Sequence, residues 1–131
     1  MHLLDEGVGS QALVNAALGL VGRIALSGKA DAGTVAAALR TAEGRVHTGI
    51  CLDLACGIGF CAEAGAVAEM LKARERRVME IVAVNRDRIL PPCGRCRELL
   101  VQVSEENVGA RVIVSRHEWR SLAELLPERW M

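Results

Sequence analysis

The chain has 131 residues, and its 16 basic and 16 acidic side chains give a formal net charge of zero. Hydrophobic residues make up 51% and charged residues 24%, which is typical of a globular domain and excludes a disordered segment. This length predicts one domain over residues 1–131. The neutral balance argues against a nucleic-acid partner, and no apolar run approaches the ~20 residues that span a membrane.

In chain order, the first predicted element is a helix from Ser10 to about Leu26, because apolar residues recur there at helical spacing. Ser10 is expected to cap its start and Gly28 to close its end. Two strands follow at 34–40 and 45–53, and the turn between them at Glu43-Gly44 predicts an antiparallel pair.

Helices and strands are then predicted to alternate. The segments are a loop at 55–60, a helix at 61–74, a strand at 78–84, a loop at 85–92, a helix at 94–103, a strand at 112–115 and a short helix or strand at 121–126. This order predicts an α/β fold, a three-layer α/β/α sandwich around a mixed five-stranded sheet.

Five cysteines are present: Cys51, Cys56, Cys61, Cys93 and Cys96. Their odd number and the absence of a signal peptide argue against a disulfide framework. Metal-bound thiolates in a reducing compartment fit better, so we expect a cytoplasmic protein.

Two short motifs carry the chemistry. They are Cys61-Ala62-Glu63 and, from the end of the predicted loop at 85–92, Pro92-Cys93-Gly94-Arg95-Cys96. Three thiolates fill three corners of a zinc tetrahedron and leave the fourth for water, while Glu63 lies close enough to handle the proton of that water. This C-x-E…P-C-x-x-C pattern is typical of zinc-dependent nucleobase deaminases, and Zn²⁺ is the expected cofactor.

Two alternatives stay open for these motifs. A closed structural zinc site needs a fourth protein ligand, which Cys51 or Cys56 would supply. Without a metal, the cysteines would be buried free thiols and Glu63 an ordinary acid in the first turn of a helix.

The chain resembles the cytidine deaminase superfamily in its small three-cysteine branch, over nearly its whole length. Besides the two motifs, the stretches that carry the resemblance are 43–49, 85–99, which looks particularly like blasticidin S deaminase, and Leu125-Leu126-Pro127. The resemblance implies Cys61, Cys93 and Cys96 as zinc ligands and Glu63 as the proton shuttle. It also implies a small-molecule aminopyrimidine substrate and a homotetramer with active sites at subunit boundaries.

The segment expected to hold the substrate departs from the family. Nucleoside deaminases carry Asn-x-Glu-Asn-Ala there, whereas this chain has Cys51-Leu52-Asp53-Leu54-Ala55. A cysteine lacks the paired donor and acceptor of an amide, and Asp53 is either a sugar contact or a strand-end residue facing water. We also expect the backbone N–H of Cys61 or Ala62 to bind the base carbonyl or the attacking oxygen.

Four further positions are candidates around the site. Trp130 corresponds to an aromatic that often covers the base in the family, or else it is a frayed end or a subunit contact. In the family an Arg often follows the C-A-E triplet, but this chain has Ala64 there. We therefore expect Arg97 or Arg86 to offset part of the negative charge of the thiolates. The alternative for Arg97 is a cation on the helix surface. Pro92 fixes the backbone ahead of the ligand.

The leading hypothesis is a zinc hydrolase that deaminates cytidine, deoxycytidine or a blasticidin S-like compound and releases ammonia. The alternative is a non-catalytic, zinc-stabilised ligand-binding or assembly module of the same fold. Deamination of a base within nucleic acid is disfavoured because the chain is neutral and has only 2% aromatic residues for stacking.

Overall fold

A computed structural model describes residues 1–131. Its elements are α1 (Gln11–Leu18), β1 (Ile24–Ala25), β2 (Ala30–Thr41), β3 (Val46–Leu54), α2 (Ala62–Lys72), β4 (Val78–Val84), β5 (Ile89–Leu90), α3 (Gly94–Val103), a 3₁₀ helix η1 (Glu105–Gly109), β6 (Arg111–Ile113), β7 (Trp119–Ser121) and α4 (Leu122–Leu125). None of the helices combines the length and the apolar character that crossing a membrane requires.

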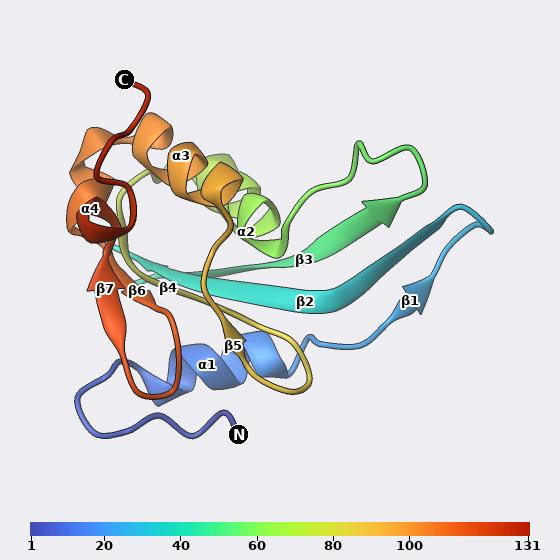
Figure 1. Ribbon diagram of the computed structural model, residues 1–131, viewed down its shortest axis with the longest axis horizontal. Coiled ribbons are helices and arrows are strands. Elements are labelled where there is room, and N and C mark those ends of the chain that lie inside the picture. Colours follow the sequence, from blue (N-terminus) through green and yellow to red (C-terminus); the bar gives the residue numbers. More distant parts are fainter.

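The strands form one mixed sheet. Its main order is β3-β2-β4-β6-β7, in which β4 and β6 are parallel and the other neighbours antiparallel. Helix α1 covers one face, and α2, α3 and α4 lie on the other (Figure 1). The predicted three-layer α/β/α sandwich is therefore confirmed, and the two-residue strands β1 and β5, which extend the sheet beside β2 and β4, were not predicted.

The first helix is shorter than predicted. Ser10 caps α1 as expected, accepting a hydrogen bond from the N–H of Leu13, but the helix ends at Gly19 rather than near Gly28. The chain then joins the sheet, because the N–H of Gly22 donates to the carbonyl of Gly33 at 2.8 Å. The apolar residues beyond residue 18 thus belong to the loop before β1 and to the strand itself.

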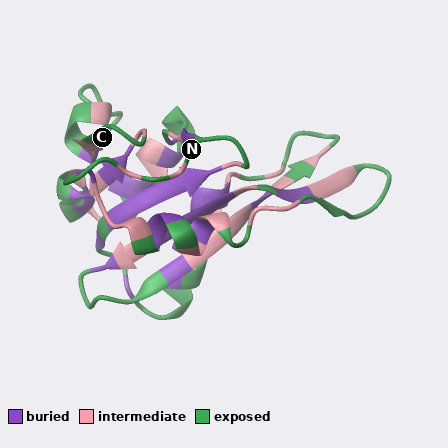
Figure 2. Cartoon of the chain, turned by 90° about the horizontal axis from the view of Figure 1, so that it is seen from below, coloured by how far each residue is buried: buried purple, intermediate pink, exposed green.

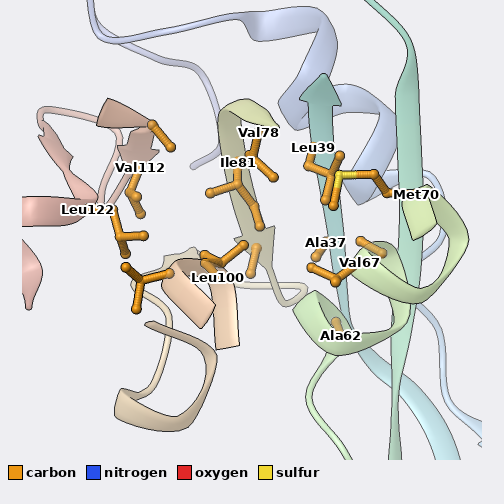
Figure 3. Packing of buried hydrophobic residues seen from close by; sticks show 14 of the residues in the cluster. Ala37, Leu39, Ala62, Val67, Met70, Val78, Ile81, Leu100, Val112 and Leu122 are labelled. Carbon is orange, nitrogen blue, oxygen red and sulfur yellow. The ribbon is translucent and has the colours of Figure 1, made fainter. Parts of the chain in front are cut away.

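Buried residues lie on both faces of the sheet (Figure 2), and the core that they form is mostly aliphatic. The larger cluster packs β2 and β4 against α2, α3 and α4 (Figure 3); it includes Ala37, Leu39, Ala62, Val67, Met70, Ile81, Leu100 and Leu122. Glycines bring α2 close to β3, because a Cβ atom on Gly49 would collide with the backbone of Ala62 and Ala66. This close approach fixes the start of α2, which carries part of the candidate site.

A buried polar cluster ties the β2–β3 hairpin to the segment after α2. The Thr41 hydroxyl donates to Glu75 Oε2 at 2.6 Å, and His47 Nε2 lies 2.8 Å from Glu75 Oε1. Hydrogen bonds from Glu43, His47 and Thr41 lower the pKa of Glu75 to about 2. The ionised Glu75 carboxylate is therefore the form that the fold favours.

This cluster predicts acid sensitivity. A carboxyl group whose pKa is lower in the folded than in the unfolded state stabilises the fold above its unfolded pKa, and this contribution disappears as the pH falls toward about 2. We expect Glu75→Gln to lower the Tm by several degrees at pH 7 and to differ little from the parent chain near pH 2. Thermal denaturation across this range, with the exposed Glu106→Gln as control, measures both effects. Equal melting temperatures for Glu75→Gln and the parent chain at pH 7 would contradict this role.

Candidate active site

Three cysteine thiols meet where α2 and α3 begin. Cys61 is the N-cap of α2, Cys93 is the N-cap of α3, and Cys96 lies in the first turn of α3. Their Sγ atoms all lie within 4.8 Å of one another. The two helix starts stand side by side above the sheet (Figure 1), so residues 32 positions apart in sequence share one site.

The spacing of these thiols suits zinc. The Sγ atoms of Cys61 and Cys93 are 3.6 Å apart, far beyond the ~2.05 Å of a disulfide. Zn–S bonds of about 2.3 Å in a tetrahedron place neighbouring sulfurs roughly 3.8 Å apart, close to this separation. Neither Cys51 nor Cys56 joins the group. The donor set therefore provides three soft ligands and leaves the fourth position open, which a closed structural site would not do.

The thiols differ in how readily they ionise. Burial raises the pKa of both Cys61 and Cys96. Burial also raises the pKa of Cys93, but hydrogen bonds from the backbone N–H of Cys96 and from the Cys61 thiol outweigh it, so the net shift is downward. Of the three thiols, only Cys93 therefore has a lowered pKa. Three thiolates this close together repel one another, so they are stable as a group only with a cation bound between them.

Glu63 lies beside the thiols in the first turn of α2. It is only 5% exposed, and burial raises the pKa of its carboxyl group. The helix start positions the side chain without making it part of the three-thiol group. A buried carboxyl group next to a metal-binding cluster is an arrangement typical of catalytic acids and bases.

One cavity of about 410 Å³ opens onto these groups, large enough for a small ligand. Cys61, Glu63 and Cys93 line it, together with three of the predicted substrate contacts, Cys51, Asp53 and Ala62. The remaining walls are mostly apolar and include Val35, Leu52, Phe60, Leu90 and Pro91.

Two polar residues of the cavity wall were missed as site residues. Arg95 lines the cavity and its side chain makes no hydrogen bond or ion pair within the chain, and Thr34 lies in β2. The position of Arg95 between Cys93 and Cys96 was a signal in the sequence, because a residue between two ligands stays near the site. Thr34 gave no comparable signal.

Other predicted residues lie elsewhere. Arg97 does not contact a thiol: its Nε donates to the carbonyl of Pro92 at 2.8 Å and its Nη1 to that of Leu125 at 3.1 Å. It therefore holds the ligand loop, including the buried Pro92, to α4. Arg86 is exposed and lines a different cavity. Trp130 is 78% exposed and does not line the thiol cavity.

An open three-thiol group with a buried carboxyl group, on a mixed sheet between helices, defines a hydrolytic deaminase. The cytidine deaminase of Mycobacterium tuberculosis is 31% identical over 97 residues, which are 72% of this chain and 70% of the relative. The chain belongs to the cytidine deaminase family. No family model matches it.

Solved structures agree with this assignment. The cytidine deaminase of Mycobacterium leprae superposes with a TM-score of 0.75 at 25% identity, covering 89% of this chain and 96% of the other. That of Burkholderia pseudomallei gives a TM-score of 0.72 at 25% identity, covering 94% and 100%. The chain is therefore similar to these enzymes over almost the whole fold.

Proposed function

We propose that this chain is a zinc-dependent hydrolase that deaminates the aminopyrimidine of a nucleoside, with cytidine or deoxycytidine as the first candidates. The observation that carries the proposal is the buried Glu63 in the same cavity as the Cys61 and Cys93 thiols. The names of the relatives, all cytidine deaminases, support the substrate class.

Cys61, Cys93 and Cys96 hold the metal in this proposal. Bound zinc supplies the Lewis acidity that makes water a nucleophile near neutral pH. The thiols of Cys61 and Cys93 sit at helix N-termini, whose partial positive charge offsets part of the negative charge of three thiolates. The first backbone N–H groups of α2, including that of Ala62, have no acceptor within the helix. They are therefore suited to bind a carbonyl oxygen of the base.

Glu63 moves the protons. Its carboxylate takes one proton from the attacking water and passes it to the ring nitrogen next to the attacked carbon. It then takes the second proton from the hydroxyl group now on that carbon and gives it to the amine, so that the C–N bond breaks, ammonia leaves and the hydroxyl becomes a carbonyl. Burial raises the pKa of Glu63 above that of an exposed carboxyl group, which makes its carboxylate a stronger base toward the proton of water.

The finer parts of the proposal concern the whole protein. We expect a cytoplasmic enzyme of one domain that assembles as a homotetramer, with Trp130 contacting a substrate or a neighbouring subunit. Exposed apolar side chains around β1 and the loop after β3, including Ile24, Leu26 and Ile58, provide surface for such contacts. Light scattering after size-exclusion chromatography measures the number of subunits.

The substrate class is tested by ammonia release. The purified, zinc-loaded protein is assayed with cytidine, deoxycytidine, free cytosine, blasticidin S and modified cytosine nucleosides. We expect turnover of at least one nucleoside and little of free cytosine, because the sugar half of the substrate adds binding energy. Silence with every compound, at about one zinc per chain, would contradict the proposal.

A further inference from the structure

One face of β3 lies against α2, the helix whose N-cap is the candidate ligand Cys61 (Figure 1). Side chains alternate along a strand, so His47 and Gly49 point to the same side of β3. Gly49 meets the start of the helix, because a Cβ atom on it would collide with the backbone of Ala62 and Ala66. This contact brings the helix close to the strand, but a glycine has no side chain that would fix the position of the helix along it.

The hydrogen bonds between β3 and α2 lie further along the helix. His47 Nδ1 is 3.3 Å from Glu69 Oε1, and the backbone N–H of Thr48 donates to the same oxygen at 3.4 Å. Glu69 is in the last turn of α2, on the face that also carries Ala62 and Ala66, because residues three and four positions apart share a helix face. The strand therefore meets this face twice, by close packing at its start and by hydrogen bonds near its end.

The other ring nitrogen of His47 binds the segment that follows α2. Nε2 lies 2.8 Å from Glu75 Oε1, and the guanidinium group of Arg45 lies 3.6 Å from the same oxygen. The Glu75 carboxylate is ionised and only accepts hydrogen bonds, so Nε2 donates to it. A ring that donates from Nδ1 to Glu69 as well carries a proton on each nitrogen. His47, which is buried, thus connects the last turn of α2 with the residues just beyond it.

We infer that His47 is a positioning residue for the active site, because its two hydrogen bonds fix where α2 lies along β3. An α-helix moves as a nearly rigid rod, and Glu63 precedes Glu69 by less than two turns. A shift at the end of α2 therefore displaces Cys61 and Glu63 relative to the thiols of α3. The inference rests on the proposed function, because it matters for catalysis only if Glu63 transfers the protons.

His47→Leu tests the inference by removing both hydrogen bonds. For zinc-loaded protein held well below its Tm, we expect kcat to fall roughly tenfold to a hundredfold with KM changed by less than about twofold, because misplaced catalytic groups slow the chemical step. Zinc affinity, measured by competition with a chelator, should weaken roughly tenfold. The matched control is His117→Leu, which breaks an exposed pair of a histidine and Asp5 outside the cavity and should change neither quantity.

Glu69→Ala tests the same contact without leaving the buried Glu75 carboxylate short of a partner. The Glu69 side chain is half-exposed, so we expect this variant to fold with little change in Tm. Its kcat and zinc affinity should fall less than those of His47→Leu, since Nε2 still binds Glu75. The double variant should be no worse than His47→Leu, because both changes remove the same hydrogen bond. Fully additive losses would contradict the inference.

Zinc affinity separates this inference from the proposed function, since its measurement needs no substrate. Weaker zinc binding in His47→Leu and Glu69→Ala, with parental affinity in His117→Leu, supports the positioning role even without turnover of any nucleoside, which would contradict only the deaminase proposal. Parental kcat and zinc affinity in both His47→Leu and Glu69→Ala, even with a lower Tm for His47→Leu, would overturn the positioning role and leave deamination intact.

Discussion

Glu63→Gln lowers kcat for the preferred nucleoside by about a hundredfold to ten-thousandfold, the range expected when a general acid–base group is removed. Glutamine keeps the shape of the side chain, but its amide neither accepts the proton of water nor delivers one to the ring nitrogen or the leaving amine. The three thiols are untouched, so the bound zinc should remain at the level of the parent chain. Steady-state ammonia release and metal analysis on the same sample measure both quantities.

Stability provides an independent check on this variant. Burial raises the pKa of Glu63 in the fold, so the ionised carboxylate costs stability as the pH rises through that pKa. Glu63→Gln should therefore melt no lower than the parent chain at pH 8. The exposed Glu105→Gln, whose side chain has no hydrogen-bond partner, is the control and should change neither activity nor Tm. Retention of more than about a tenth of kcat by Glu63→Gln would rule out the proposed proton shuttle.

Cys96→Ala abolishes both zinc binding and activity. Cys96 is the most enclosed of the three thiols, at 2% exposure, and two thiols alone do not complete a zinc site of this kind. We expect the zinc content to fall from about one per chain to near zero and the Tm to drop, because metal binding contributes to folding stability. A chelator should produce the same loss in the parent chain, and added Zn²⁺ should reverse it while Mg²⁺ does not, because thiolates select soft metals.

Cys56→Ala is the matched control for this experiment. Its thiol is exposed and stands outside the three-thiol group, so zinc content, activity and chelator sensitivity should equal those of the parent chain. Full zinc loading of Cys96→Ala would show that the metal is held elsewhere, and loss of zinc in Cys56→Ala would restore the closed four-cysteine site as the explanation.

The chemistry of the site was predictable because it depends on short, local patterns. Cys61-Ala62-Glu63 and Pro92-Cys93 each mark a helix start, and a helix start fixes the direction of its first side chains. The fold class followed in the same way, since the long strands β2, β3 and β4 carry clear apolar patterns. Two such helix starts on the same face of one sheet bring the thiols together.

The rest depends on contacts that local patterns do not encode. The apolar spacing that predicts a helix up to Leu26 is interrupted by Gly19 and Gly22. The residues after Gly19 form backbone hydrogen bonds with β2 instead of continuing the helix. Arg97 was expected near a thiolate, but carbonyl groups of Pro92 and of α4 compete for it, and α4 comes close only through tertiary packing. The pairing of β2 with β3 shifts register between Ala32 and Ala36, where Gly33 has a φ of 86°, and this irregularity likewise arises only once β1, β2 and β3 are paired.

The central claim, that this site hydrolyses an amino group from a nucleoside, is tested most directly by the source of the product's oxygen. Zinc-loaded protein is incubated with cytidine in water enriched in heavy oxygen, and the nucleoside is analysed by mass spectrometry alongside the released ammonia. The account predicts uridine carrying one heavy oxygen atom, formed in equal amount with ammonia. A deaminated product without the heavy oxygen would contradict it, and so would the absence of turnover with cytidine and with every other nucleoside of the ammonia-release panel.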